Sequence, residues 1–445
     1  MFAALLLAGL LVDSVPQYAY GQVILPNSPA ETPPWSSLQV FDPVWFARFW
    51  SRDANEAVAP EDTPVKTRVQ PGFESVGIRA GSWMFSPAIT AGSFYDSNVF
   101  ASSADKHGDL AGVVEPSLGI SSLWDRHALN IGASVRSIDY RSFSGLNQTD
   151  ANLQMRGRID VWHDAAILTS FRLASLHEGV GSLTSPAGAA EPTPYTFASA
   201  DVSYWQQFNR LATSFGVRAD SYDYGSTRAQ DGTIINQDSR DGHVHVAHGR
   251  VDYAISPDFG VFSSFEANRR DLRGTPTQPL SSDGYRSLTG IDVQLTHLIM
   301  SEIAAGYASQ RFDDPGIGTI AGPSYRASLH WSPTRMLDLH VQAEQIVTEA
   351  ADTVASGIRA NAFQIGADYE LRRDTVLSVS GTYERDKFFG QSREDTVYAT
   401  EAALKHLFNR YIYISARYRY LRRDSSAPSS SYDKHEVALN VTAHY

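Results

Sequence analysis

The last ten residues of the chain, 436–445, read EVALNVTAHY. Apolar side chains recur there at every second position, and most of the residues between them are polar. Side chains of a β-strand point alternately to opposite faces, so this spacing predicts a strand with one apolar and one polar face. A final strand that ends on an aromatic residue resembles the C-terminal signal read by the assembly machinery of outer-membrane barrels. The residues expected to carry this signal are Val437, Leu439, Val441, Ala443 and Tyr445.

The same alternation continues upstream, in residues 337–344, 361–371 and 411–420. A soluble β-sandwich would show it too, so alternation alone does not identify a membrane barrel. Aromatic residues, 11% of the chain, concentrate near the expected strand ends, where a barrel carries its interfacial girdles. The residues expected in these girdles are Tyr95, Trp124, Tyr140, Trp162, Trp205, Tyr222, Tyr253, Trp331, Tyr369, Tyr383 and Tyr420.

Composition excludes several classes of protein. Beyond the N-terminus no run approaches the roughly 18–20 apolar residues that a membrane helix needs. The absence of cysteine excludes disulfides, thiolate metal sites and a lipoprotein anchor. A net charge of −12 argues against a general nucleic-acid binder.

Short polar turns recur along the chain at intervals that fit one hairpin each. They fall near Asp125, Asp164, Asn209, Pro257, His297, Pro333, Arg373 and Asn409. About 9–11 tilted residues cross a bilayer as a strand, so each interval holds two strands and a longer loop. With a first and a last strand added, the count is about eighteen, with an uncertainty of about two. The sequence therefore predicts an all-β, antiparallel, up-and-down transmembrane barrel with both barrel termini on the periplasmic side.

The N-terminal part of the chain lacks this pattern. Residues 1–21 have an apolar core and small residues before Gln22, which predicts a secretory signal peptide. A buried N-terminal helix is the alternative, although Pro16 would end it. Residues 22–76 are rich in proline and are expected to form an irregular periplasmic extension. The barrel is expected to occupy residues 77–445.

Two stretches resemble the putative β-barrel porin 2 family, namely residues 71–100 and 109–129. The matching elements are Gly77, Gly81, Pro87, the run from Tyr95 to Phe100, Pro116, Ser117, Trp124, Arg126 and His127. Members of this family are often associated with exopolysaccharide secretion. The resemblance implies an outer-membrane barrel that works beside a periplasmic polysaccharide-export protein.

A barrel of this size leaves a water-filled lumen, whose selectivity depends on the inward residues. Four arginines lie on the polar face of strands in residues 129–173, whereas residues 337–384 carry acids with no matching base. These walls are about nine strands apart, so we expect a transverse field across the pore; ordinary charged walls are the alternative. The residues expected to line the pore are Arg136, Arg156, Arg158, Arg172, Asp338, Glu344, Asp368, Glu370, Glu384, Arg417 and Arg419.

Signals for catalysis or cofactors are weak. His243 and His245 share a strand face and, with His248, are a candidate metal site, but a solvated pair at the loop rim fits better. The chain has no nucleophile elbow, phosphate loop or HExxH motif, so we expect neither an enzyme nor a cofactor. The long loops at 178–194 and 225–242 either fold into the barrel mouth and narrow it or remain on the surface.

These observations predict an outer-membrane channel that carries an exopolysaccharide. The expected partners are membrane lipid, the barrel assembly machinery, a periplasmic polysaccharide-export protein that contacts residues 22–73, and a polysaccharide chain in the lumen, but no nucleic acid. A passive diffusion porin for small solutes is the main alternative. An outer-membrane enzyme or a surface scaffold is the third.

Overall fold

The computed structural model describes residues 64–445 except 67, 69, 71, 187, 276–278, 296–297 and 349–356. Nineteen of its strands form one antiparallel sheet. The three-residue strand β1 (Ile78–Ala80) pairs only with β2, and the other eighteen strands close into a barrel. Around the barrel they are β2 (Trp83–Asp96), β3 (Asp109–Ser122), β4 (Ala128–Tyr140), β5 (Gln148–Trp162), β6 (Ala165–Glu178), β7 (Thr193–Phe208), β8 (Leu211–Tyr224), β11 (Gly242–Ser256), β12 (Phe259–Leu272), β13 (Ser282–Leu295), β14 (Ile299–Phe312), β15 (Thr319–Thr334), β16 (Leu337–Thr348), β17 (Gly357–Arg372), β18 (Thr375–Phe389), β19 (Glu394–Leu407), β20 (Ile412–Ser425) and β21 (Tyr432–His444).

The barrel closes between its first and last strands. β2 pairs with β21 from Ala88 opposite His444 to Asp96 opposite Glu436. The predicted eighteen-stranded antiparallel barrel is therefore confirmed. The strands are 12 to 16 residues long, which exceeds the ~9–11 residues needed to cross a bilayer, so they extend beyond it.

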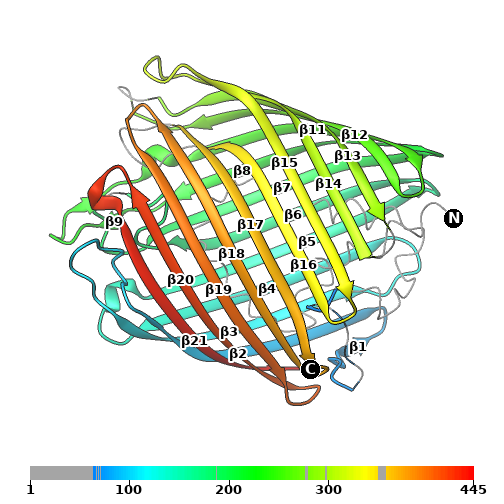
Figure 1. Ribbon diagram of the computed structural model, residues 1–445, viewed down its shortest axis with the longest axis horizontal. Helices are drawn as coiled ribbons and strands as arrows, with labels where there is room; N and C mark the ends of the chain where they lie inside the picture. The colour runs from blue at the N-terminus through cyan, green and yellow to red at the C-terminus, as the bar shows by residue number, and fades with distance from the viewer. Residues whose placement is uncertain are drawn as a thin grey trace.

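Short turns and long loops lie at opposite ends of the barrel. The C-terminus marks the end with the short turns, here called the turn end, and β9 (Thr227–Arg228) marks the loop end (Figure 1). Most turns fall where the sequence predicts them; at one of them Asn209 adopts a φ of 52°, which asparagine tolerates well. Pro333 itself lies in β15, which ends at Thr334, so the turn predicted there falls two residues later, at Arg335 and Met336. The turn predicted at His297 lies outside the described residues.

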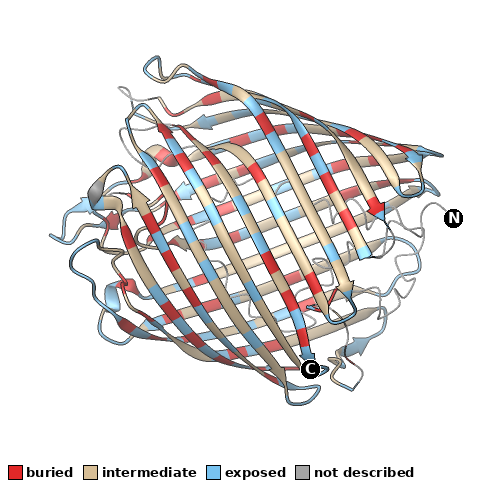
Figure 2. Ribbon diagram, in the orientation of Figure 1, coloured by how far each residue is buried: buried red, intermediate tan, exposed pale blue. Residues whose placement is uncertain are grey.

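The two faces of the barrel wall differ in chemistry. In β21, Val437 and Leu439 are 53% and 57% exposed, whereas Ala438 and Asn440 between them are each 2% exposed. Buried and exposed positions alternate along the other strands as well (Figure 2). Large apolar side chains cover the outer face, from Phe215 on β8 to Ile365 on β17. A continuous apolar belt of this extent requires lipid around it. No helix among the described residues has the length and apolar character to cross a membrane.

Three of the expected girdle residues are on the other face. Tyr140, Trp205 and Tyr222 lie opposite Ala111, Ser214 and Gly242 in register and belong to the inward face. Trp205 and Tyr222 are buried there, and Tyr140 packs edge-on against Phe94. The expectation was wrong because closeness to a strand end does not determine which face a side chain occupies.

Candidate functional site: the barrel lumen

The cross-strand register determines which charged side chains face the lumen. Directly paired residues of neighbouring strands share a face of the wall. Thr90 and Thr442 contact each other on the inner face, and the pairings starting from them identify the inward residues of every strand. Arg136, Arg156, Arg158, Arg172, Asp338, Glu344, Asp368, Glu370, Glu384, Arg417 and Arg419 all belong to the inward face. The structure adds inward charges that the sequence reasoning missed, among them Arg250, Arg286, Glu302, Arg326 and Asp386.

The acidic wall has basic partners. Glu344 receives hydrogen bonds from Arg286 at 2.7 Å and Arg326 at 2.9 Å, and these arginines come from β13 and β15. The expectation that these acids lack a basic partner is wrong for Glu344. Its two arginines precede residues 337–384, the stretch within which bases were sought. On the opposite wall Arg158 pairs with Asp160 at 2.6 Å. Close pairs cancel much of each other's field, so the transverse field stays a prediction and must be weaker than the residue count suggests.

At the loop end, the loop joining β6 to β7 folds into the barrel. Leu183 of this inward loop (residues 179–192) is 7% exposed and packs in one cluster with Ile358 and Ala360 of β17 and Phe388 of β18. β17 is nine strands away from β6 around the barrel. The inward loop therefore reaches across the lumen and contacts the opposite wall. Of the two alternatives for this loop, folding into the barrel mouth or remaining on the surface, the structure shows the first.

Polar contacts fix the tip of the inward loop. Arg423 of β20 donates a hydrogen bond to the carbonyl oxygen of Gly181 at 2.7 Å, and the Tyr432 hydroxyl donates to the same oxygen at 2.9 Å. Gly181 has a φ of 78°, and a Cβ there would lie 2.1 Å from the Cβ of Ala101. Only glycine fits both the backbone conformation and this close approach.

A buried ion pair holds the base of the inward loop. Arg240 donates to both carboxylate oxygens of Glu178, at 2.8 and 2.7 Å, and the two side chains are 5% and 1% exposed. Arg240 belongs to a second loop, the supporting loop (residues 225–241), and lies 3.8 Å above the ring centroid of Tyr224. Burial lowers the pKa of the Arg240 guanidinium, but the Glu178 carboxylate together with Tyr224 and Tyr195 more than offsets burial, so the pKa lies above its ordinary value. The supporting loop thus fixes the inward loop through a charge pair that excludes water.

At the turn end, part of the N-terminal region enters the lumen. This docked segment (residues 64–73 apart from 67, 69 and 71) has Val65 only 1% exposed, and the Val65 backbone N–H donates a hydrogen bond to the Asp338 carboxylate. Arg68 and Gln70 bind the Glu370 carboxylate at 3.2 and 3.1 Å. Asp338 and Glu370, expected to act on passing solutes, instead hold the chain's own N-terminal region. The predicted signal peptide (residues 1–21) and residues 22–63 of the predicted extension lie outside the described residues.

Comparison with protein families shows to which family the chain belongs. The family described as "Putative beta-barrel porin 2" matches residues 70–445. The chain belongs to this family. The resemblance inferred from two short stretches is therefore confirmed across the barrel, and this porin is an outer-membrane β-barrel channel.

Three bacterial proteins are among the solved structures that resemble this porin. OpdK of Pseudomonas aeruginosa with vanillate is 9% identical, with a TM-score of 0.45, and the match covers 81% of this porin and 99% of OpdK. OccAB3 of Acinetobacter baumannii is 9% identical, with a TM-score of 0.44, and covers 82% and 100%. The siderophore receptor PirA of Pseudomonas aeruginosa is 8% identical, with a TM-score of 0.40, and covers 81% and 80%.

One similarity points elsewhere. The chicken (Gallus gallus) protein "Dehydrogenase/reductase SDR family member 11" is 26% identical over an alignment of 186 residues, and the match covers 38% of this porin and 70% of the reductase. Dinucleotide-binding oxidoreductase folds are built on a parallel sheet. Every strand pairing among the described residues of the porin is antiparallel, so this similarity does not extend to the fold.

The histidines considered as a metal site are not brought together. His243 and His245 share the outer face of β11, with ring centroids 6.5 Å apart. His248 lies on the inner face and contacts the Asp201 carboxylate at 2.8 Å. Within the described part of the porin no group of three or more metal-ligating side chains is present.

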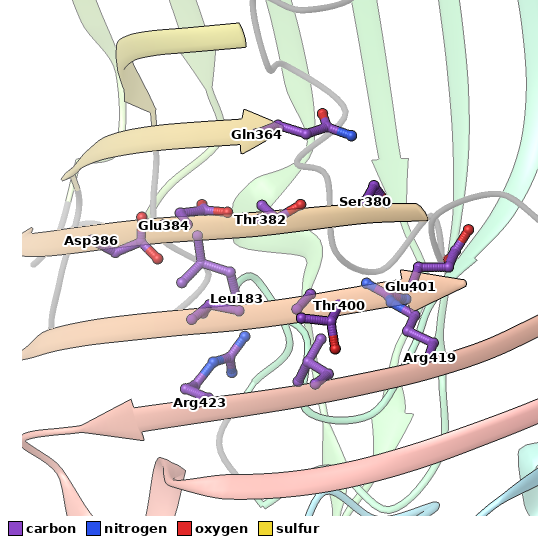
Figure 3. A pocket seen from close by; sticks show the side chains of 13 residues that line it. Leu183, Gln364, Ser380, Thr382, Glu384, Asp386, Thr400, Glu401, Arg419 and Arg423 are labelled. Atoms are coloured by element: carbon purple, nitrogen blue, oxygen red, sulfur yellow. The ribbon is translucent and has the colours of Figure 1, made fainter. Parts of the chain in front are cut away.

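A cavity of about 100 Å³ lies on the lumen wall beneath the inward loop (Figure 3). Its polar lining comes from adjacent strands β17 to β20, and Leu183 adds an apolar contact from the loop. The cavity is lined by Leu183, Gln364, Ser380, Thr382, Glu384, Asp386, Val397, Ala399, Thr400, Glu401, Arg419, Leu421 and Arg423. Glu384 and Arg419, expected to line the pore, are thus part of one site.

Proposed function

We propose that this porin is the outer-membrane conduit for an exopolysaccharide and works with a periplasmic polysaccharide-export protein. The observation that carries the proposal is that the chain's own segments occupy both ends of the lumen. The inward loop crosses the loop end to reach Ile358, and the docked segment contacts Asp338 at the turn end. A pore that is narrowed at both ends suits a dedicated conduit better than an open sieve for small solutes.

The chemistry of the inner wall suits a sugar chain. Partly exposed charged side chains face the lumen, among them Arg156, Arg158 and Glu401. Paired charges such as Arg158 and Asp160 can bind the hydroxyl groups of a sugar without a strong net field. Many weak contacts let a polymer move, whereas a few strong contacts would stop it.

The orientation and the partners follow from this proposal. The turn end faces the periplasm, as short turns do in outer-membrane barrels. Residues 22–73 are then the part of the chain that a periplasmic partner contacts, and pulling them away would release Val65 and Arg68 from the wall. Val437, Leu439, Val441, Ala443 and Tyr445 face the lipid on the strand that closes the barrel, where the assembly machinery can read them.

A reversible crosslink tests the proposal. The chain has no cysteine, so the double variant Leu183→Cys/Ala360→Cys carries a single pair of thiols, on the inward loop and the wall that it contacts. Oxidation should stop polysaccharide release by cells that depend on this porin, and reduction should restore it. Each single-cysteine variant is the control. Polymer release that continues at full rate through the oxidised double variant would contradict the proposal.

Passive diffusion of small solutes is the second candidate function, because the matching family is described as a family of porins. It predicts a large and steady conductance of the complete chain and needs no partner. Opening that depends on release of the docked segment or the inward loop would exclude it.

A further inference from the structure

We infer that the outer face of β17 and β18, at the loop end, binds the phosphate group of a membrane lipid. The site, here called the cationic rim, consists of Arg359 on β17 and of Arg385 and Lys387 on β18. These two strands are neighbours in the wall, and the rim lies where they approach the loop end (Figure 1). The inference concerns the lipid around the barrel, so it goes beyond the proposed function and does not depend on the solute in the lumen.

The strand register places the cationic rim on the outside of the barrel. Arg359 and Lys387 lie directly opposite each other, and Asn361 and Arg385 form the next pair on the same face. Arg385 and Lys387 are exposed, whereas Asp386 between them is 0% exposed and faces inward. Successive side chains of a strand point to opposite faces, so the three cations point toward the membrane side of the wall.

The closest pair of the rim consists of two like charges. Like charges directly opposite each other destabilise a sheet. Among the described residues, Arg359 and Lys387 form no ion pair; Arg359 donates a hydrogen bond to the carbonyl oxygen of Ala321 at 3.0 Å. Both cations lie near the ring of Phe389, with Arg359 Cζ 5.5 Å and Lys387 Nζ 5.9 Å from its centroid. A ring attracts cations without neutralising them, so this pair favours an anionic ligand.

The nearby carboxylate does not balance the rim. Glu394 of β19 lies directly opposite Lys387 and pairs with Arg385 at 2.9 Å. The outward residues of β16 near this end, Gln345 and Val347, are uncharged. Three cations therefore share one carboxylate. A phosphate group fits the remaining charge, because arginine binds it through two parallel hydrogen bonds and lysine binds it as a point charge.

A row of aromatic side chains places the cationic rim at the depth of lipid headgroups. Phe363, Tyr383 and Tyr398 are directly paired across β17, β18 and β19 and are 42%, 40% and 44% exposed. The rim lies two to four residues further along the strands, or about 7–13 Å at ~3.3 Å per residue. With a strand tilt of ~35–45°, it is roughly 5–10 Å above the aromatic row. Headgroups extend roughly 5–8 Å beyond the hydrocarbon core, so the rim can hold the phosphate while the aromatic row contacts the acyl chains.

Other outward arginines at the loop end are balanced by acids. Arg269 of β12 lies 2.7 Å from Asp271 and 3.2 Å from Asp313. Arg311 of β14 pairs with Asp283 at 2.8 Å. These two arginines face three carboxylates, which repel a phosphate. They share the face and the end of the barrel with the cationic rim but lack its excess of positive charge.

Native mass spectrometry of the complete, detergent-solubilised porin tests the cationic rim. The probes are lipid A with two phosphates, lipid A from which both phosphates have been removed, and inorganic phosphate. We expect at least fivefold more porin to retain the bisphosphorylated lipid than the dephosphorylated one. Inorganic phosphate at the same concentration should not displace the lipid, because it lacks acyl chains. Displacement by inorganic phosphate would overturn a lipid as the occupant.

The double variant Arg359→Gln/Lys387→Gln should lower retention of the bisphosphorylated lipid at least fivefold. Lys387→Arg conserves the charge and should retain the lipid, and Lys387→Gln alone should lower retention at least twofold if the double variant does not fold. The matched control is Arg269→Gln/Arg311→Gln, which removes the same charge from the same face and end and should leave retention unchanged. Equal retention of the two lipids, or an equal loss in both double variants, would overturn the site.

Discussion

The two ends of the lumen are restricted in physically different ways. At the loop end, an apolar cluster around Leu183 and the buried Glu178–Arg240 pair hold the inward loop. At the turn end, mainly polar contacts to Asp338 and Glu370 hold the docked segment. Apolar packing and a buried ion pair are costly to disrupt, whereas polar contacts exchange readily with water. The difference indicates a firm constriction at the loop end and a releasable one at the turn end.

Breaking the buried Glu178–Arg240 ion pair should raise single-channel conductance the most. Arg240→Ala leaves the buried Glu178 carboxylate with the Thr184 hydroxyl but without its cationic partner, which costs about 3–5 kcal/mol locally. We expect the inward loop to leave the lumen, so that single-channel conductance rises severalfold and protease cleaves within residues 179–192. The control is Arg228→Ala, which removes an exposed pair with Glu191 at 3.8 Å. Equal protease resistance of both variants would refute the role of the buried pair.

Truncating the apolar side chain of Leu183 should cause the next largest rise in conductance. Leu183→Ala removes packing against Ile358 and Phe388 and should cost about 2–5 kcal/mol of local stability. Conductance should rise, but less than in Arg240→Ala, because Arg423 still holds the loop tip. Leu183→Met conserves volume and serves as the control. A conductance as low as in the unchanged protein would mean that the polar contacts alone hold the loop.

The turn end should respond more mildly. Asp338→Asn together with Glu370→Gln weakens the contacts to Val65, Arg68 and Gln70, each worth about 1 kcal/mol. We expect faster hydrogen exchange in residues 64–73 and more frequent opening, with the loop end unchanged. Glu394→Gln, an exposed acid paired with Arg385, is the control. Hydrogen exchange at 64–73 that stays as slow as in the unchanged protein would show that other contacts hold this segment.

Charge selectivity should change least. Arg156→Gln together with Arg158→Gln removes two inward cations and leaves Asp160 without the Arg158 partner. The reversal potential in a salt gradient should shift modestly toward cation selectivity, because neighbouring pairs already balance much of the wall. Arg385→Gln on the outer face controls for the change in total charge. An identical reversal potential in all three proteins would rule out the transverse field.

The sequence predicted the barrel because its determinants are local. Period-two alternation in 437–445 and turn residues such as Asn209 act within a few positions, and both agree with the structure. The assignment of Arg136 and Glu384 to the polar face followed from the same alternation.

The restrictions on the lumen depend on contacts between distant parts of the chain. Leu183 meets Ile358, and Val65 meets Asp338, only after the barrel has closed. The bases that pair with Glu344 likewise come from other strands. No local pattern marks which loop turns inward, because the left-handed backbone of Gly181 and its closeness to Ala101 are known only from the structure.

The central claim is that the chain itself keeps both ends of the lumen narrow. The most direct test is single-channel conductance of the refolded chain beginning at residue 22, compared with the same chain lacking residues 22–73 and with each also carrying Arg240→Ala. The account predicts a small or flickering conductance for the complete chain, a partial increase for either change, and a large steady conductance for both together. A large steady conductance of the complete chain, unaffected by either change, would contradict it.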